Sequence, residues 1–113
     1  MHELSITQSM LDIVLDHARR HAAQKVVKVR VVIGKMSGVA VESVRFCFEA
    51  VTKETLAEGA ALEIEEVPYA GKCAECSTAF EIQDYTLACP RCSSTDIEIT
   101  GGRELYVKDF EAD

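Results

Sequence analysis

The residues with the clearest chemistry are four cysteines arranged as two Cys-x-x-Cys pairs. Cys73-Ala-Glu-Cys76 and Cys89-Pro-Arg-Cys92 are joined by a spacer of 12 residues. Two tight turns can bring the four sulfurs to one point, and four thiolates at one point suit a tetrahedral zinc ion. Because four protein ligands leave no open coordination position, such a site is structural rather than catalytic. Two disulfides or a thiol redox motif are the alternatives, and the matching spacing of the pairs favours zinc.

The length and composition limit the class of protein. The chain has 113 residues, 48% of them hydrophobic, which is enough for one domain or for one small domain with an insert. No apolar run approaches the roughly 18 residues that a membrane helix needs. The first residues also lack the basic and apolar regions of a secretory signal. We therefore expect a cytoplasmic protein that has no membrane partner and whose thiols stay reduced.

The charge balance is acidic, with a net charge of −7 from 19 acidic and 12 basic residues. Zinc held by four thiolates would add about two further negative charges. A protein that binds nucleic acid needs a basic surface, so the charge argues against nucleic acid as a partner. The acidic second half of the chain is either a solvated surface or an attractive surface for a basic protein.

Periodic patterns predict two helices and three strands outside the cysteine segment. Ser5 and Gln8 have the form of a capping box, which predicts a first helix from there to about Ala23. A second helix is expected from about 41 to 53. Alternation of apolar and polar side chains predicts strands over 25–33, 62–67 and 104–110.

The segment between the last two predicted strands, residues 68–102, contains both cysteine pairs and few large apolar residues. It cannot fold on core burial alone, and zinc would supply the missing free energy, on the order of 10 kcal/mol for small structural sites. We expect a zinc ribbon with short strands around Phe80 and Ile97. The whole pattern predicts an α+β fold, in which a three-stranded sheet with two helices (residues 1–67 and 103–113) carries the zinc-ribbon domain (68–102) as an insertion.

Three further residues could carry chemistry. His17 and His21 are four apart on the first predicted helix, a spacing that can place two imidazoles on one metal. A histidine near a helix C-terminus is also stabilised by the helix dipole without any ligand role. Cys47 is the unpaired fifth cysteine, and its place on the apolar side of the second predicted helix indicates a small buried hydrophobic residue.

The N-terminal tripeptide Met1-His2-Glu3 can chelate a metal through its backbone. The terminal amine, the amide nitrogen of His2 and the His2 imidazole form fused five- and six-membered rings, and the amide nitrogen of Glu3 or an outside ligand can complete a square. Nitrogen-rich square-planar sites suit Ni(II) and Cu(II). Binding requires loss of protons from the amides and therefore weakens as the pH falls. Taken alone, the tripeptide favours the simpler interpretation, a frayed terminus that leads into a capped helix.

The chain as a whole resembles the HypA/HybF family of nickel metallochaperones for [NiFe]-hydrogenase maturation. The matching segments are Met-His-Glu-Leu-Ser at 1–5, Val-Val-Ile-Gly at 31–34, Phe-x-Phe-Glu-Ala at 46–50, Leu-Glu-Ile-Glu-Glu-Val-Pro at 62–68, both cysteine pairs, and Glu-Leu-Tyr-Val-Lys at 104–108. The resemblance implies that His2 binds nickel with backbone nitrogens near Met1 and Glu3, and that Cys73, Cys76, Cys89 and Cys92 bind structural zinc. It also implies partnership with the nickel-handling GTPase HypB and delivery of Ni(II) to the hydrogenase large subunit.

The first hypothesis is thus a carrier without enzymatic activity, which transfers nickel from a weak terminal site and keeps zinc in a closed one. A zinc-ribbon interaction module without nickel transfer is the second hypothesis. The third is a thiol oxidoreductase that uses one Cys-x-x-Cys pair, and it predicts reactive thiols in the purified protein.

Overall fold

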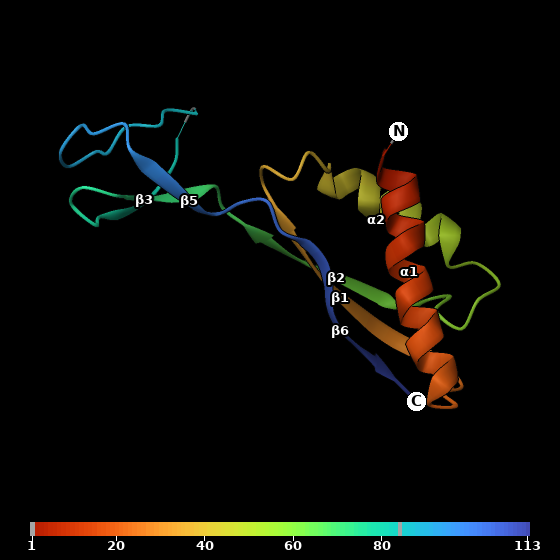
Figure 1. The fold of residues 1–113 in the computed structure, drawn as a ribbon. Coiled ribbons are helices and arrows are strands. Elements are labelled where there is room, and N and C mark those ends of the chain that lie inside the picture. Colours follow the sequence, from red (N-terminus) through yellow and green to blue (C-terminus); the bar gives the residue numbers. More distant parts are fainter. Residues whose placement is uncertain (1, 84) are drawn as a thin grey trace.

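The computed structural model describes residues 2–83 and 85–113, with His2 described in its backbone only. The elements found in this part of the chain are α1 (His2–Arg20), β1 (Val26–Gly34), α2 (Val41–Val51), β2 (Ala61–Val67), β3 (Ala70–Cys73), β4 (Ala79–Glu81), β5 (Ile97–Gly101) and β6 (Leu105–Ala112). They form two separate three-stranded sheets along a molecule that measures 55 × 27 × 17 Å (Figure 1). None of the described helices is long and apolar enough to cross a membrane.

The larger sheet, which we call sheet A, has the strand order β2-β1-β6. Strands β1 and β2 are parallel, so the chain between them must cross over, and α2 supplies that connection. Strand β6 returns from the far end of the chain and pairs antiparallel with β1, which places Val31 between Ile64 and Val107. The predicted three-stranded sheet with a returning last strand is confirmed.

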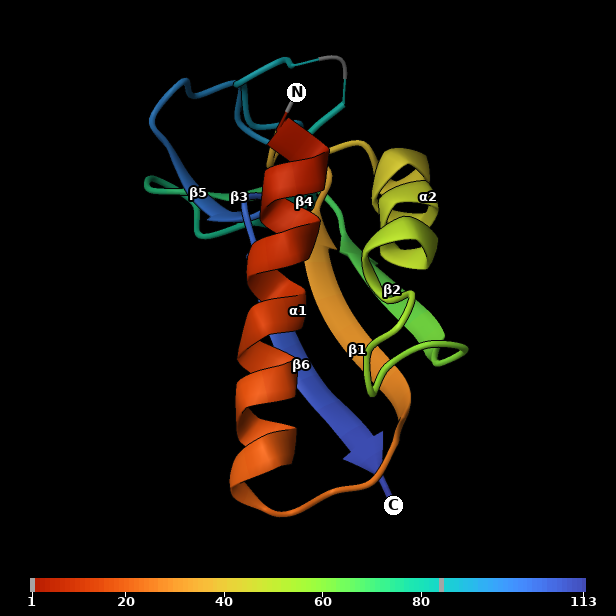
Figure 2. The same ribbon diagram turned by 90° about the vertical axis from the view of Figure 1, so that its right-hand side faces the viewer.

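Both helices cover the same face of sheet A (Figure 2). Their apolar stripes and the alternate residues of β1 form the hydrophobic core, whose buried members are Met10, Leu11, Val14, Leu15, Ala18, Val26, Val29, Val31, Ile33, Val44, Phe48 and Ala57. Helical and strand repeats bring one side of each element inward, so the periodicity of the sequence selects most of these positions. The start of β1 is an exception: the alternation predicts that Val27 is buried and Val26 is not, but Val26 is buried and Val27 is exposed, because the pairing with β6 shifts register between Val26 and Lys28. The opposite face of the sheet is polar.

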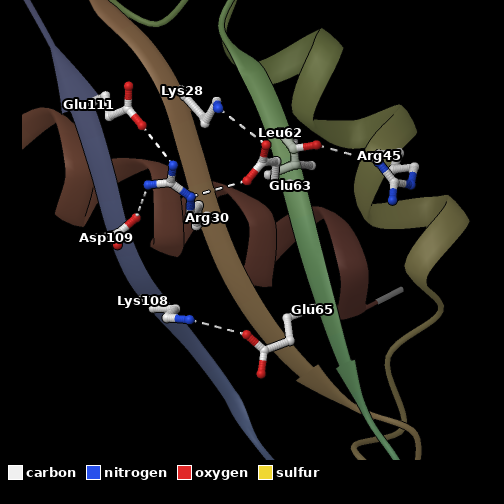
Figure 3. A network of polar contacts seen from close by, with 9 residues as sticks. All are labelled: Lys28, Arg30, Arg45, Leu62, Glu63, Glu65, Lys108, Asp109 and Glu111. Carbon is white, nitrogen blue, oxygen red and sulfur yellow. Dashed lines mark hydrogen bonds and ion pairs between the residues drawn. The ribbon is translucent and has the colours of Figure 1, made fainter.

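A charge network centred on Arg30 ties the three strands together on that polar face (Figure 3). The guanidinium donates to Glu63 on β2 at 3.1 Å and, on β6, to Asp109 at 2.8 Å and Glu111 at 2.7 Å. Lys28 adds an ion pair to Glu63 at 3.2 Å. Asp109 and then Glu111 raise the pKa of the Arg30 guanidinium, which stays charged. The network joins both edge strands to the central strand.

The smaller sheet, sheet B, has the order β4-β3-β5 and is antiparallel throughout. Strands near Phe80 and Ile97 were expected, whereas the central strand β3 gives no sequence signal because it is only Ala-Gly-Lys-Cys. Among the described residues of this segment, the buried hydrophobic side chains are Cys73, Ile82 and Cys89. The segment therefore has no sizeable apolar core, as the sequence predicts.

The two sheets are joined at a close backbone contact. The amide of Gly34 donates to the Glu104 carbonyl at 2.7 Å, and the amide of Met36 donates to the Gly102 carbonyl at 2.6 Å. Gly102 has a φ of +120°, a conformation that favours glycine. The loop after β1 thus packs directly on the chain that returns from sheet B.

The predicted start of the first helix is wrong. Helix α1 begins at His2, so Ser5 lies inside its first turns and is exposed. The Gln8 side chain does not reach back to Ser5 and instead donates to Asp12 at 2.8 Å. The Thr7 hydroxyl donates to the Glu3 carbonyl at 2.6 Å, and Thr7 is buried. The Glu3 carboxylate in this first turn accepts a hydrogen bond from the amide of Ala40 at 3.2 Å, so a contact with a distant segment holds the start of the helix.

Candidate metal centres

The four cysteines of the two pairs meet at the far end of sheet B. Their sulfurs all lie within 4.8 Å of one another, and the distances Cys73–Cys92 and Cys76–Cys89 are each 3.5 Å. Zn–S bonds of about 2.3 Å in a tetrahedron place sulfurs about 3.8 Å apart. The donor set and its dimensions therefore fit one zinc ion with four thiolate ligands.

The two halves of the cluster have the same backbone construction. The amide of Cys73 donates to the Thr78 carbonyl at 3.0 Å, and the amide of Cys89 donates to the Ser94 carbonyl at 2.8 Å. In each turn the serine after the second cysteine is left-handed, with φ of 62° at Ser77 and 65° at Ser93. Amides also point at the sulfurs, as from Cys76 to Cys73 at 3.4 Å. Such N–H groups stabilise thiolates.

Two thiols of the cluster have pKa values that differ in opposite directions from that of an ordinary cysteine. The hydroxyl and then the backbone of Thr78 lower the pKa of the Cys76 thiol to about 6. For Cys92 the backbone N–H of Ser94 lowers the pKa, but the neighbouring thiols, Cys73 first, and desolvation together raise it to about 12. Cys76 therefore ionises easily, whereas negative charge on Cys92 is disfavoured beside the other sulfurs. Zinc removes this conflict, because thiolate ligands are deprotonated in its field.

Thr78 and Ser94 are residues of this site that the sequence reasoning missed. They follow the cysteine pairs at the same position in Cys-x-x-Cys-Ser-Thr and Cys-x-x-Cys-Ser-Ser. This short repeat is the signal that could have found them, because two equal turns around one ion need equal backbone bonds.

At the other candidate centre, Met1 and the side chain of His2 lie outside the described part of the chain. The backbone of His2 is the first residue of α1. The Glu3 carboxylate accepts a hydrogen bond from the amide of Ala40 at 3.2 Å, just before α2. The N-terminus is thereby placed beside the start of α2. The first backbone amides of a helix, the amide of His2 among them, have no hydrogen-bond acceptor within the helix.

His17 and His21 are both exposed at the C-terminal end of α1. The Nδ1 of His21 lies 2.9 Å from the His17 carbonyl oxygen, so that ring is turned toward the helix backbone. Among the described residues, the cysteine quartet is the one group of three or more potential ligands close enough to hold an ion. The geometry favours a helix-terminal role for this pair over a metal site.

Cys47 is half-buried, so the prediction of a buried side chain is wrong. Helix α2 directs Val44 and Phe48 into the core, and Cys47 lies at the margin of that stripe beside the exposed Phe46. The apolar stripe of a helix is about 100° wide or more, so the helical repeat shows that a residue belongs to the stripe but not whether it lies at the centre or at the edge.

Comparison with known proteins identifies the family of the chain. The family profile described as "Hydrogenase/urease nickel incorporation, metallochaperone, hypA" matches residues 1–112. The chain belongs to the HypA family. The resemblance seen in the sequence is thereby confirmed, and the family is one of metallochaperones by its description.

Relatives within the HypA family match along nearly their whole length. The chain is similar to the hydrogenase maturation factor HypA of Dechloromonas aromatica, with 45% identity over 98% of both chains. It is similar to that of Geobacter sulfurreducens with 42% identity over 100% of both. The solution structure of the Ni metallochaperone HypA from Helicobacter pylori has a TM-score of 0.66 at 28% identity and covers 97% of this chain and 96% of its own. A second solution structure of a HypA protein reaches a TM-score of 0.72 at 29% identity, with coverage of 99% and 96%.

Proposed function

We propose that this protein is a nickel metallochaperone that binds Ni(II) at its N-terminus and delivers it for [NiFe]-hydrogenase maturation. The observation that carries the proposal is membership of the HypA family through a match that begins at residue 1 and includes Met1-His2-Glu3. The ligands would be the His2 imidazole, the His2 amide and the terminal amine of Met1. The amide of Glu3 is the candidate for the fourth position.

The two metals would have different roles because their sites differ in ligand number and softness. Four thiolates favour zinc and hold it in a closed tetrahedron. A few nitrogen donors at a chain end favour Ni(II), leave it accessible and allow its release. In this proposal residues 1–67 with 103–113 form the nickel-binding domain, and residues 68–102 form a zinc-ribbon domain whose metal maintains the fold.

Metallochaperones act through partners, and family membership supports partners in hydrogenase maturation. The proposed ones are the nickel-handling GTPase HypB and the hydrogenase large subunit, in the cytoplasm. No catalytic step is assigned to the protein, because transfer of an ion between ligand sets needs exchange of ligands and no covalent chemistry.

The test is a nickel titration followed by absorption spectroscopy on protein with its native, untagged N-terminus. We expect one Ni(II) per chain, binding that weakens as pH falls, and zinc content that does not change. His2→Ala and acetylation of the terminal amine should each abolish the 1:1 complex. The matched control is the double variant His17→Ala/His21→Ala, which removes both other histidines and should bind nickel as the native protein does.

Unchanged nickel binding in His2→Ala would refute the terminal site. If the native protein bound no nickel at all, while loss of a ribbon cysteine abolished partner binding, the protein would be a zinc-ribbon interaction module instead. Reactive thiols in zinc-loaded protein would point to a thiol oxidoreductase.

A further inference from the structure

An apolar groove lies between the first turn of α1 and the outward side of α2. It has a volume of about 520 Å³, and its lining residues are Glu3, Leu4, Glu42, Ser43, Phe46, Cys47 and Ala50. Because Glu3 is one of them, the groove reaches the first turn of α1. It is outside the hydrophobic core and separate from the cysteine cluster.

The fold does not account for the apolar side chains of this groove. Phe46 is 76% exposed and Leu4 is 48% exposed. Helix α2 already supplies Val44 and Phe48 to the core, so Phe46 is a second, unused apolar position on the same short helix. Neighbouring large apolar residues exposed in this way mark a contact surface more often than an isolated one does.

The charges around the groove define what would fit it. The side chain of Glu42 is 90% exposed, and its ion pair with Arg45 is long, with 3.6 Å between the guanidinium nitrogen and the carboxylate oxygen. Arg45 also donates toward the Leu62 carbonyl at 3.4 Å, on the edge of β2. Glu49 is exposed on the same helix. An apolar groove with carboxylates at its border is complementary to an amphipathic helix with lysine or arginine beside its apolar stripe.

Two other occupants fit the charges less well. A second copy related by a twofold axis would bring the same acidic residues of both copies together. An anionic lipid surface would repel Glu42 and Glu49. A basic partner avoids both penalties.

We propose that this groove is the docking site for a basic amphipathic helix of a partner protein. Docking there would bring the partner's surface next to the N-terminus, where an ion can pass between the two proteins without entering bulk water. Only this use in nickel transfer rests on the proposed function; binding of the helix to the groove does not.

The probe is a synthetic helical peptide of about five turns, with leucines at i, i+3, i+4 and i+7 and lysines on both sides of that stripe. Its affinity for the zinc-loaded protein is measured by calorimetry. We expect binding that weakens with added salt. Binding to Phe46→Ser and to Glu42→Lys should be at least about tenfold weaker, since the first removes the most exposed apolar side chain of the groove and the second reverses a charge at its border. A peptide with glutamate in place of lysine should not bind.

Matched control variants distinguish binding in the groove from non-specific binding of the peptide. Ile13→Ser removes an apolar side chain that is 52% exposed on the far side of α1. Glu58→Lys makes the same charge change as Glu42→Lys, but in the loop after α2. Both should bind the peptide as the native protein does. Equal losses in Ile13→Ser and Phe46→Ser, or equal binding of the glutamate peptide, would overturn the proposal. The proposal would also be overturned if the native protein dimerised, or bound phosphatidylglycerol vesicles, and Phe46→Ser abolished that interaction.

A nickel titration of Phe46→Ser keeps the two proposals distinguishable. Normal 1:1 nickel binding together with lost peptide binding supports a docking groove separate from the ion's ligands. Peptide binding by a native protein that takes up no nickel would support the groove and refute the proposed nickel function.

Discussion

The contact between the two sheets can be tested by adding one methyl group. A Cβ on Gly34 would overlap the carbonyl group of Gly102 and would lie 2.6 Å from the amide nitrogen of Arg103. These neighbours are backbone atoms and cannot rotate away as a side chain would. Gly34→Ala must therefore push the chain that returns from sheet B away from the end of β1.

The cost follows from what that displacement breaks. The amides of Gly34 and Met36 would lose their carbonyl partners in Glu104 and Gly102, and such bonds contribute roughly 1 kcal/mol each. Forcing extra volume into a packed site costs about 1 to 3 kcal/mol more. We expect Gly34→Ala to lower the free energy of unfolding by about 3 to 5 kcal/mol, a large part of the 5 to 15 kcal/mol typical of a domain.

The assay is urea unfolding of zinc-loaded protein followed by circular dichroism. Gly38→Ala and Gly59→Ala are the controls, since an added Cβ meets no atom within 4 Å at either position and the only penalty is a φ of +82° or +81°. Each should cost about 1 kcal/mol. If Gly34→Ala were no more harmful than these controls, the close backbone contact would not be a rigid junction.

Three further predictions address the metal cluster, the first helix and the charge network. Cys89→Ser should lose zinc and the hydrogen-exchange protection of β3 to β5. The amides of sheet A should stay protected, because no residue of 68–102 belongs to the hydrophobic core under that sheet. Loss of protection in both sheets would contradict this prediction. Ser5→Ala should be neutral or stabilise by up to about 0.5 kcal/mol as a position inside a helix, whereas a true N-cap would lose about 1 kcal/mol in thermal unfolding. Lys28 lowers the pKa of Glu63, so Glu63→Gln should lower the free energy of unfolding at neutral pH. The variant and the native protein should become equally stable once the pH falls through the folded pKa of Glu63. A difference in stability that persists in acid would exclude an ionic cause.

The amino-acid sequence determined those features whose physical cause is local. The spacing of Cys73, Cys76, Cys89 and Cys92 fixes two equal turns, and four thiols in two such turns have one favourable arrangement around a metal. Alternation over Val29, Val31 and Ile33 and helical repeats in α1 and α2 identify which side of each element is buried. The scarcity of apolar residues between 68 and 102 identifies the segment that needs a metal.

The tertiary structure decided what depends on contacts between distant segments. Helix α1 starts at His2 rather than after Ser5 because its first turn packs beside α2, where Glu3 accepts the amide of Ala40. Strand β3 exists because β4 and β5 pair with it on both sides, and four residues without alternation carry no signal of their own. Periodicity already leaves Phe46 off the buried side of α2, but only the tertiary structure shows that it lines a groove together with Leu4 of α1.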